Sequence, residues 1–439
     1  MGPRVSERVQ RHQQWLGSQA LVPTLGRVFS NLYSAQHNSD GVINAGLAEN
    51  SLMHDWLAKF YETHLKLSSV DLTYGTSMVG STRLFDVYSK FLNTYFNPHD
   101  PVSAQNQIVA GVGLSAILDC LSRVLFDQGD LMILARPYYN TFPADFRGSG
   151  DVELLGVEVP AGRNGLLDEV EALHKQMEKL EQQGRHGKVK AVMLTNPHNP
   201  LGFNYSRDTI LEYCRFAEKW NLWLISDEIY ALSVFKSDVP RPRPFTSILS
   251  IDVLQEAKCD PSRIVHLYGA SKDFGSNGIR IGVVTVQHNP QLYEALLAVG
   301  FPIKISSVAD IVWSALLKAP ELADYVKKNQ SALAESYKFA TDWLRQRNIP
   351  YTPAEAGHFI LIDLRSYLTP SHNKKVKHDL LEQEIRLLND MVDAGVYLGP
   401  GHSYHCVDYG FFRISHSIPR DALILALERL DKVLDSKAR

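Results

Sequence analysis

Five short apolar segments in the middle of the chain limit the possible folds more than any other feature. They alternate with segments in which apolar residues recur at helical spacing, as in residues 113–121 and 207–219. The apolar segments are residues 131–134, 189–194, 222–225, 264–267 and 283–286. Strands that alternate with helices predict an α/β domain with a mostly parallel sheet, which binds its ligands at the carboxyl ends of the strands.

The two ends of the chain have a different pattern. At 439 residues, the chain exceeds what one hydrophobic core usually serves. Its last part contains long amphipathic helical segments, an apolar strand at residues 359–364 and a final helix at residues 420–433. We therefore expect a large central domain over residues 66–320 and a smaller α+β domain over residues 321–439, with residues 1–65 as an arm that packs on the smaller domain.

Charge and composition exclude several classes of partner. The chain carries 45 Lys and Arg against 48 Asp and Glu, and its net charge of −3 gives no electrostatic basis for binding nucleic acid or an anionic membrane. No apolar run reaches the length of a membrane span, and the first residues lack the apolar core of a signal peptide. The four cysteines form no CxxC pair, as is usual for reduced thiols. These features predict a cytoplasmic protein.

Polar and aromatic residues follow several of the predicted strands. Asp227 comes just after the strand at 222–225, Asn199 lies in the proline-rich segment after 189–194, and Tyr139 follows 131–134. Taken singly, each has an ordinary explanation: such an aspartate commonly caps a helix, Asn-Pro pairs mark turns, and aromatic side chains pack. Because parallel strands end at one edge of their sheet, we expect these residues to lie together.

A lysine and an arginine, Lys272 and Arg280, occupy a segment rich in glycine and serine after the strand at 264–267. A lysine held after a buried strand loses its proton more readily, and the neutral amine forms Schiff bases. The planar guanidinium of arginine binds phosphate oxygens, and Gly113 at a helix start offers backbone N–H groups to the same phosphate. With Asp227 to hold a pyridinium proton and a tyrosine to cover a ring, these are the groups that pyridoxal 5'-phosphate (PLP) needs.

Six motifs together resemble those of one enzyme family. They are Gly46-Leu47-Ala48-Glu49-Asn50, Pro137-Tyr138-Tyr139, residues 196–202 (NPHNPLG), Ser226-Asp227-Glu228-Ile229-Tyr230, Ser271-Lys272-Asp273 and Phe411-Phe412-Arg413. The chain resembles fold-type I PLP-dependent enzymes of the class I/II aminotransferase group over about residues 40 to 430, and most of all the 1-aminocyclopropane-1-carboxylate (ACC) synthases and their fungal and animal relatives. This resemblance implies a mixed, mostly parallel seven-stranded sheet in the large domain, next to a smaller α+β domain.

The resemblance implies a role in cofactor binding for each of several residues. Lys272 binds the cofactor aldehyde as a Schiff base and later moves protons at the substrate Cα, while Asp227 pairs with the pyridine nitrogen. Asn199 and Tyr230 form hydrogen bonds with the 3'-oxygen of the ring, and Tyr230 counts with Lys272 and Asp227 among the catalytic residues. The resemblance also implies that Tyr139 stacks on the cofactor ring. The phosphate is bound by Arg280, Ser271 and the backbone amides of Gly113 and Leu114.

Substrate and subunit contacts also follow from the resemblance. Arg413 binds the substrate α-carboxylate, with Glu49 and Asn199 as further substrate contacts, which implies a small-molecule substrate of the α-amino-acid class. Tyr74 reaches the phosphate of a neighbouring subunit, which implies a homodimer with shared sites. One departure concerns the phosphate: Gly269 stands where the family usually carries a hydroxyl, and we expect weaker cofactor anchorage as a result.

The reaction depends on how the carbanion formed at the substrate Cα collapses. Glu49 favours the ACC-synthase side, where a sulfur leaving group is expelled, although an acidic residue at a helix start would also explain it. Residues 72–74 lack the Gln and Asp of plant ACC synthases, residues 75–81 make a longer link than usual, and no arginine occurs in residues 140–144. We therefore expect cleavage of a carbon–sulfur bond in S-adenosylmethionine or a cysteine conjugate, with an aminotransferase as the alternative.

Two other functions have weaker support. His402, His405 and Cys406 could bind zinc, but they immediately precede the Arg413 motif and no other ligand cluster is near them in sequence. We expect no metal there and place His405 in the wall of the pocket. A PLP-binding transcription regulator would need a DNA-binding domain, and residues 1–40 are too short and carry no basic cluster.

Overall fold

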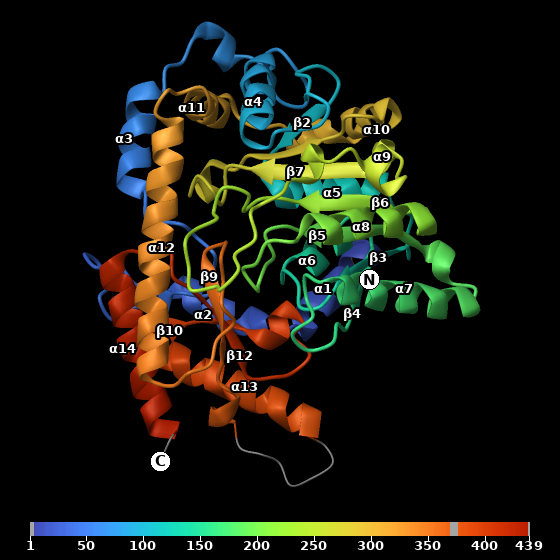
Figure 1. Cartoon of the computed structure of the whole chain (residues 1–439). Coiled ribbons are helices and arrows are strands. Elements are labelled where there is room, and N and C mark those ends of the chain that lie inside the picture. The colour runs from blue at the N-terminus through green and yellow to red at the C-terminus, as the bar shows by residue number, and fades with distance from the viewer. Residues whose placement is uncertain (1–3, 369–375, 438–439) are drawn as a thin grey trace.

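The computed structural model of the chain describes residues 4–368 and 376–437 (Figure 1). The strands in these ranges are β1 (Ile43–Asn44), β2 (Ile108–Gly111), β3 (Leu131–Ala135), β4 (Glu153–Val157), β5 (Val189–Thr195), β6 (Trp223–Asp227), β7 (Ile264–Gly269), β8 (Gly282–Thr285), β9 (Phe359–Asp363), β10 (Val396–Tyr397), β11 (Gly399–Pro400) and β12 (Phe411–Ser415). The α-helices are α1 (Glu7–Ser18), α2 (Leu21–Ser30), α3 (His54–His64), α4 (Thr82–Tyr95), α5 (Leu114–Val124), α6 (Phe142–Arg147), α7 (Leu167–Gln182), α8 (Arg207–Trp220), α9 (Val253–Ala257), α10 (Pro290–Gly300), α11 (Ser307–Leu317), α12 (Leu322–Gln346), α13 (Val376–Asp393) and α14 (Arg420–Lys437).

The central sheet has seven strands in the order β2-β8-β7-β6-β5-β3-β4. The strands from β7 to β4 are mutually parallel, while β8 is antiparallel to both of its neighbours. This confirms the mixed, mostly parallel sheet and the five predicted strands within it. The search for apolar runs did not predict two strands of this sheet. β2 is short and ends in Ala110-Gly111, and β4 is exposed at its start.

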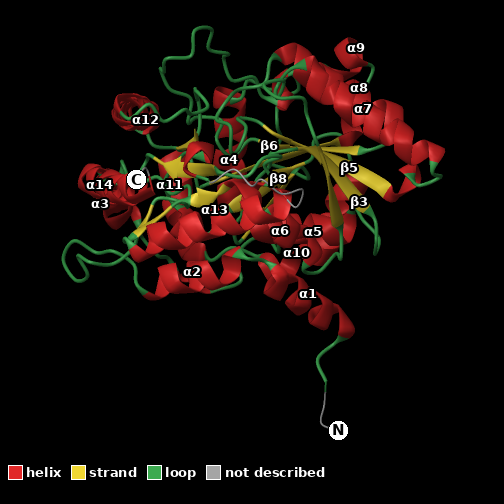
Figure 2. Cartoon of the chain, turned by 90° about the horizontal axis from the view of Figure 1, so that it is seen from below, coloured by secondary structure: helices red, strands yellow, loops and turns green. Residues whose placement is uncertain are grey.

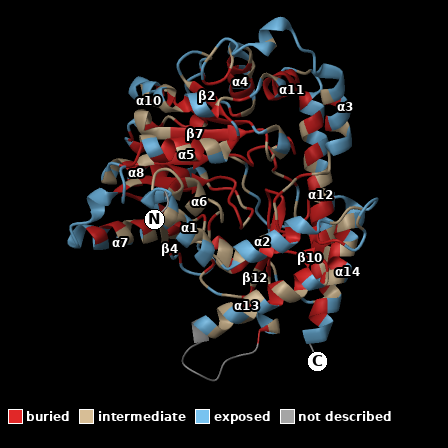
Figure 3. Ribbon diagram, turned by 180° about the vertical axis from the view of Figure 1, so that it is seen from behind, coloured by how far each residue is buried: buried red, intermediate tan, exposed pale blue. Residues whose placement is uncertain are grey.

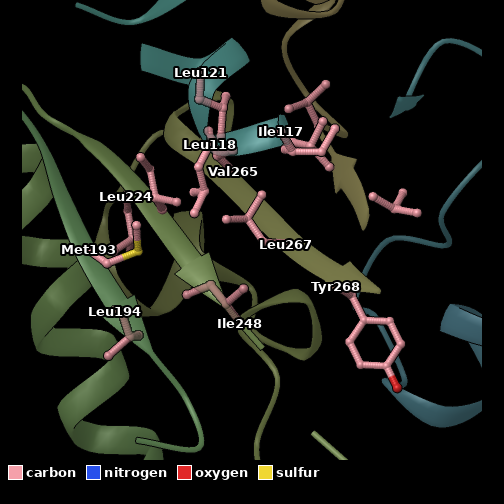
Figure 4. Close-up of a cluster of buried hydrophobic side chains, with 14 of the residues drawn as sticks. Ile117, Leu118, Leu121, Met193, Leu194, Leu224, Ile248, Val265, Leu267 and Tyr268 are labelled. Carbon is pink, nitrogen blue, oxygen red and sulfur yellow. The ribbon is translucent and has the colours of Figure 1, made fainter. Parts of the chain in front are cut away.

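Helices cover both faces of this sheet. Figure 2 shows α7 and α8 on one face and α5, α6 and α10 on the other. In Figure 4, Ile117, Leu118 and Leu121 of α5 lie beside Val265 and Leu267 of β7, and all five side chains are buried. The apolar period in residues 113–121 is therefore the stripe by which α5 packs on the sheet.

Local capping explains how α8 leads into the strand that carries Asp227. The Ser206 side chain accepts a hydrogen bond from the Thr209 amide at the start of the helix. At its end, Asn221 adopts a left-handed conformation with φ of 53°, which asparagine tolerates well. The chain therefore reverses within two residues, and β6 runs back through the sheet to end at Asp227.

A second group of strands lies below the central sheet in Figure 1. It contains the antiparallel sheet β11-β12-β9 and the parallel pair β1-β10. A separate hydrophobic cluster packs these strands against α12, α13 and α14, with Val28 of α2 and Ile43 of β1. Leu57 and Phe60 of α3 pack instead in the cluster of the central sheet. Side chains from the first 65 residues therefore contribute to both clusters.

Burial follows these layers. In Figure 3 most strands are buried, and the exposed residues lie mainly on the outer faces of helices and on loops. Helix α12 extends alongside both groups of strands (Figure 1), and its Tyr325 and Leu333 belong to the upper and lower clusters respectively. Within the described ranges, no helix is both long enough and apolar enough to cross a membrane.

Candidate active site

The carboxyl ends of β5, β6 and β7 meet at a cavity of about 130 Å³. Thr195 ends β5, Asp227 ends β6, and Lys272 follows the end of β7 by three residues. The predicted site residues that line the cavity are Leu114, Tyr139, Asn199, Asp227, Tyr230, Ser271, Lys272 and Arg280. Sequence reasoning did not single out the other lining residues, which are Ser115, Leu118, Phe142, Asp145, Thr195, Ile229 and Asn277.

Lys272 is enclosed among charged groups. Its Nζ donates a hydrogen bond to the backbone oxygen of Ala48 at 2.7 Å. Part of the side chain is accessible from the cavity, but the amine lies deep in the protein. This burial, together with the charge of Arg413, lowers the pKa of Lys272 to about 8, although Glu49 and Asp227 act in the opposite direction. The amine is therefore poised to become a neutral nucleophile near neutral pH.

This lowered pKa predicts how the apo-protein captures an aldehyde cofactor. Below about pH 8 the Lys272 amine holds a proton and has no free lone pair, and above that pH it is neutral. We expect the rate of PLP attachment to rise with pH and to level off above the pKa of about 8. Stopped-flow absorbance across a pH series measures this rate. A rate that falls as the pH rises from 7 to 9 would contradict the assignment.

Asp227 lines the cavity at the point where β6 ends. Its Oδ1 accepts the amide of Ile229 at 3.2 Å, so the residue also stabilises the turn that follows the strand. Burial raises the pKa of Asp227 to about 7, because the charged form loses its hydration. A buried carboxyl group that faces a lysine across a cavity is suited to hold a proton on a ligand.

The amino end of α5 and Arg280 form one wall of the cavity. Gly113 caps α5 with φ of 96°, and its own amide donates to Gly111 O at 2.7 Å. Arg280 has a left-handed backbone (φ 61°) and donates from Nη1 to Asn277 O at 2.8 Å and from Nη2 to Val112 O at 3.3 Å. A guanidinium beside a helix N-terminus attracts anions.

Gly113 leaves no room for a side chain, so Gly113→Ala is expected to weaken PLP binding. A Cβ there would lie 2.2 Å from Nη2 of Arg280, at a positive φ that alanine rarely adopts. Strain of about 1–3 kcal/mol should displace Arg280 and raise the Kd for PLP by about tenfold or more. Fluorescence titration of the apo-protein measures this, with Gly278→Ala as the control, since a Cβ at 278 meets nothing within 4 Å. Equal Kd values in both variants would refute the argument.

The structure gives a physical reason for Gly269, where the resemblance led us to expect a hydroxyl. A Cβ at this position would lie 2.6 Å from the backbone oxygen of Ile281 and 3.1 Å from the Cα of Gly282. Gly282 is equally restricted, because its Cβ would lie 2.4 Å from the Leu114 amide nitrogen. The two glycines let β7, β8 and the start of α5 approach closely. The Ser115 hydroxyl, which the sequence analysis did not consider, lines the cavity nearby.

Arg413 lies in β12, next to β9, and reaches the site from the second group of strands. Only 2% of the residue is exposed. Its Nη1 donates to Asn199 Oδ1 at 2.8 Å and its Nη2 to Gly46 O at 2.6 Å, while Nε has no hydrogen-bond partner among the described residues. The guanidinium carbon lies 4.6 Å from the ring centre of Phe359 and 4.5 Å from that of Tyr404. This buried, oriented cation is suited to a carboxylate.

Glu49 and the two tyrosines complete the surroundings of Lys272. Glu49 Oε1 accepts the side-chain amide of Asn277 at 2.7 Å, which joins the GLAEN motif to the cavity wall. Tyr139 packs its ring edge against Phe142, with ring centres 5.2 Å apart. Tyr230 packs perpendicular to Phe359 at 5.4 Å. These aromatic neighbours hold the rings of Tyr139 and Tyr230 at the cavity.

Two sequence features lie away from this cavity. Tyr74 is 82% exposed and its backbone oxygen accepts from Lys304, so the chain does not bring it to its own site. His402 Nδ1 lies 2.7 Å from Glu384 Oε1, and His405 stacks on Tyr138 with ring centres 4.2 Å apart. His405 is not among the residues that line the Lys272 cavity. In the described part of the chain, no three His, Cys, Asp or Glu side chains are grouped to hold a metal ion.

Comparison with known proteins accounts for this arrangement. The family model "Aminotransferase class I and II" matches residues 43–430. The chain belongs to the class I and II aminotransferase family. A probable aminotransferase of Aspergillus fumigatus, gliI, is 32% identical over 98% of this chain and 96% of its own length. The human 1-aminocyclopropane-1-carboxylate synthase-like protein 1 is 29% identical over 93% of this chain and 79% of that protein.

Solved structures confirm the fold. Aspartate aminotransferase from Thermus thermophilus with maleate is 18% identical, with a TM-score of 0.74 over 98% of this chain and 100% of that one. Membership of this family implies PLP as the cofactor, and the cavity fits that group. It offers an amine with a lowered pKa, a buried carboxyl group, and an anion-attracting helix start at Gly113, where the missing Cβ lets Arg280 lie close.

Proposed function

We propose that the chain is a PLP-dependent enzyme that removes the Cα proton of an amino acid and expels a sulfur leaving group from its side chain. The observation that carries the proposal is the meeting of Lys272 and Asp227 at one cavity, with Arg413 hydrogen-bonded to Asn199 of the cavity lining. The pKa of Lys272 is lowered by burial and by the charge of Arg413, so the group that binds a carboxylate also increases the fraction of neutral amine that can accept the Cα proton.

Each residue has a separate task in this scheme. Arg413 binds the substrate α-carboxylate with its oriented guanidinium, and Asn199 keeps that guanidinium in place. Bound PLP supplies a conjugated ring that withdraws electrons from the substrate Cα. Asp227 holds a proton at the pyridine nitrogen, Arg280 and the start of α5 bind the phosphate, and Lys272 Nζ takes the proton from Cα.

Glu49 supports elimination as the outcome. Its carboxylate is anchored by Asn277 at the cavity wall, and its charge acts on Lys272. A carboxylate at this position stabilises a cationic sulfonium group in the substrate. When the carbon–sulfur bond breaks, the bonding electrons leave with sulfur, and a sulfonium departs as a neutral thioether. A thiolate leaving group takes up a proton instead.

Transamination is the second candidate, and the name of the Aspergillus fumigatus relative favours it. The two reactions differ in their need for a 2-oxo acid, which transamination requires to complete each cycle. The holoenzyme is therefore incubated with S-adenosylmethionine and with S-alkylcysteine, without a 2-oxo acid. We expect many molecules of thioether or thiol released per active site. Turnover that occurs only with an added 2-oxo acid, without release of sulfur product, would replace elimination by transamination.

A matched variant tests the part assigned to Glu49. Glu49→Gln keeps the shape of the side chain but removes its charge. We expect the KM for S-adenosylmethionine to rise about tenfold, since one close ion pair is lost in a partly buried site, with little change for the neutral S-alkylcysteine. Equal changes for both substrates would exclude a role in binding the sulfonium.

We also propose a cytoplasmic homodimer in which Tyr74 reaches the phosphate site of a second copy. Tyr74 lies in an exposed apolar segment with Leu72, which is 78% exposed, and Met78. Sedimentation velocity is expected to give twice the chain mass of 49.3 kDa. Mixing and refolding the inactive variants Tyr74→Ala and Lys272→Ala together should restore activity, because each hybrid dimer contains one complete site. Absence of recovery in verified hybrids would exclude shared sites.

A further inference from the structure

The turn that carries Arg280 is held by a helix from the first part of the chain. Ser276 immediately precedes the short 3-10 turn η5 (Asn277–Ile279), and Arg280 follows it. The Ser276 hydroxyl oxygen lies 2.8 Å from the phenol oxygen of Tyr61 in α3, 215 positions away. Neither residue lines the Lys272 cavity, and Ser276 is only 6% exposed. Any effect of this contact on ligand binding is therefore indirect.

The direction of this hydrogen bond follows from the other contact of the Ser276 hydroxyl. Its Oγ donates to Phe274 O at 2.8 Å, which uses the single proton of the hydroxyl. The Ser276 oxygen must then accept, so Tyr61 is the donor. Burial raises the pKa of Tyr61 to about 12, against the smaller effect of the hydrogen bond with Ser276. The phenol therefore keeps its proton and remains a donor throughout the neutral pH range.

Hydrogen bonds within the turn continue from Ser276 to the guanidinium. The Ile279 amide donates to Ser276 O at 3.0 Å, which closes the turn. Arg280 Nη1 donates to Asn277 O at 2.8 Å, so the residue that follows Ser276 holds the guanidinium. The place of the guanidinium therefore depends on the place of the backbone that begins at Ser276.

Helix α3 contacts this loop at two neighbouring residues. His54 Nε2 lies 3.0 Å from Gly275 O, next to the contact between Tyr61 and Ser276. Positions 54 and 61 are two helical turns apart, so both side chains project from one face of α3. Other residues of the helix, at positions 57 and 60, are buried in the cluster of the central sheet. The core therefore fixes α3, and α3 in turn holds the loop.

We propose that Tyr61 is a positioning residue for the cofactor phosphate: through Ser276 it fixes the turn that presents the Arg280 guanidinium beside the start of α5. A guanidinium binds phosphate oxygens well only when its planar N–H groups are aligned with them, so a small displacement of the turn weakens the contact. The inference rests on the proposed function only in requiring that PLP binds at Lys272 with its phosphate at Arg280. It is independent of whether elimination or transamination follows.

The test compares two aldehydes that differ only in the phosphate. Absorbance titration of the apo-protein gives the Kd for PLP and for pyridoxal, which lacks the phosphate group. Tyr61→Phe removes one hydroxyl and keeps the ring. We expect it to raise the Kd for PLP about three- to tenfold, since one hydrogen bond is lost, and to leave the Kd for pyridoxal unchanged.

Ser276→Ala and the double variant test whether the two hydroxyls act together. Ser276→Ala should raise the Kd for PLP at least as much as Tyr61→Phe, because it also removes the hydrogen bond to Phe274 O. The double variant should equal Ser276→Ala, since Tyr61 has already lost its partner there.

Tyr325→Phe is the matched control. Tyr325 is also a buried tyrosine, and its hydroxyl donates to Asp273 O in the same loop at 3.2 Å. That oxygen lies on the Lys272 side of Ser276 and also accepts from Asn329 at 3.3 Å. The Kd for PLP in this variant should therefore equal that of wild type.

The possible results separate this inference from the proposed function. An unchanged Kd for PLP in Tyr61→Phe, or equal rises for PLP and pyridoxal, would overturn the inference. Rises that add in the double variant would overturn it as well. If Ser276→Ala does not fold, the comparison of Tyr61→Phe with Tyr325→Phe decides. A wild type that forms no lysine-bound band with PLP would contradict the proposed function, and with it this inference.

Discussion

Lys272→Ala is expected to remove the absorbance band of lysine-bound PLP and to lower kcat by about 10³-fold or more. Lys272 is the amine at the cavity that burial makes nucleophilic, and it is also the base assigned to the substrate Cα. One substitution therefore removes both the covalent anchor and the proton acceptor. Absorbance spectra with excess PLP and steady-state assays measure the two losses separately.

Lys272→Arg separates this chemistry from the effect of charge. Arginine retains a cation beside Asp227 and Glu49, but its guanidinium stays protonated and forms no bond with an aldehyde at ordinary pH. It should therefore be as inactive as Lys272→Ala while it preserves the electrostatic balance of the site. An absorbance band of normal intensity in Lys272→Ala would show that PLP is attached elsewhere, and the assignment of Lys272 would fail.

Asp227→Asn is expected to lower kcat by about 10²- to 10³-fold while PLP still binds. The change keeps the shape of the side chain, so the turn held through Ile229 should persist. The amide carries no charge to hold a proton at the pyridine nitrogen, and the ring then withdraws electrons less strongly. The measurement is kcat at saturating substrate, together with the Kd for PLP.

Asp145 offers a control from the same cavity. Burial raises the pKa of both Asp145 and Asp227 to about 7, and both side chains line the cavity. Asp145 lies in α6 and has no part in the proposed reaction, so Asp145→Asn should change kcat by less than about threefold. Comparable losses in the two variants would mean that general electrostatics, and not the position of Asp227, accounts for the effect.

Sequence reasoning located the residues at strand ends because their positions follow from the topology alone. Once residues 189–194, 222–225 and 264–267 are identified as parallel strands, Asn199, Asp227 and Lys272 must lie near one edge of the sheet. The structure places all three around one cavity. Arg413 could not be located in this way, since it comes from a different sheet, and only the family resemblance identified it.

Other features depend on contacts between distant parts of the chain, which sequence spacing does not reveal. Asn199 and Arg413 are 214 positions apart, and Glu49 and Asn277 are 228 apart. The absence of a hydroxyl at Gly269 suggested weak anchorage, yet the space around it is filled by the backbone of Ile281 and Gly282. In each case the role of a residue depends on its contact with a residue of another element. Only the folded chain shows that contact.

The two aromatic rings around Arg413 have a consequence for the thermodynamics of substrate binding. A free arginine side chain carries about 2 kcal/mol of rotamer entropy. Here Phe359, Tyr404 and two hydrogen bonds hold the guanidinium in one orientation. That ordering is completed when the chain folds, so a carboxylate that binds Arg413 meets a rigid partner and little further protein entropy is lost. For a carboxylate bound there, affinity is governed mainly by desolvation and hydrogen bonding, with only a small cost for ordering the protein.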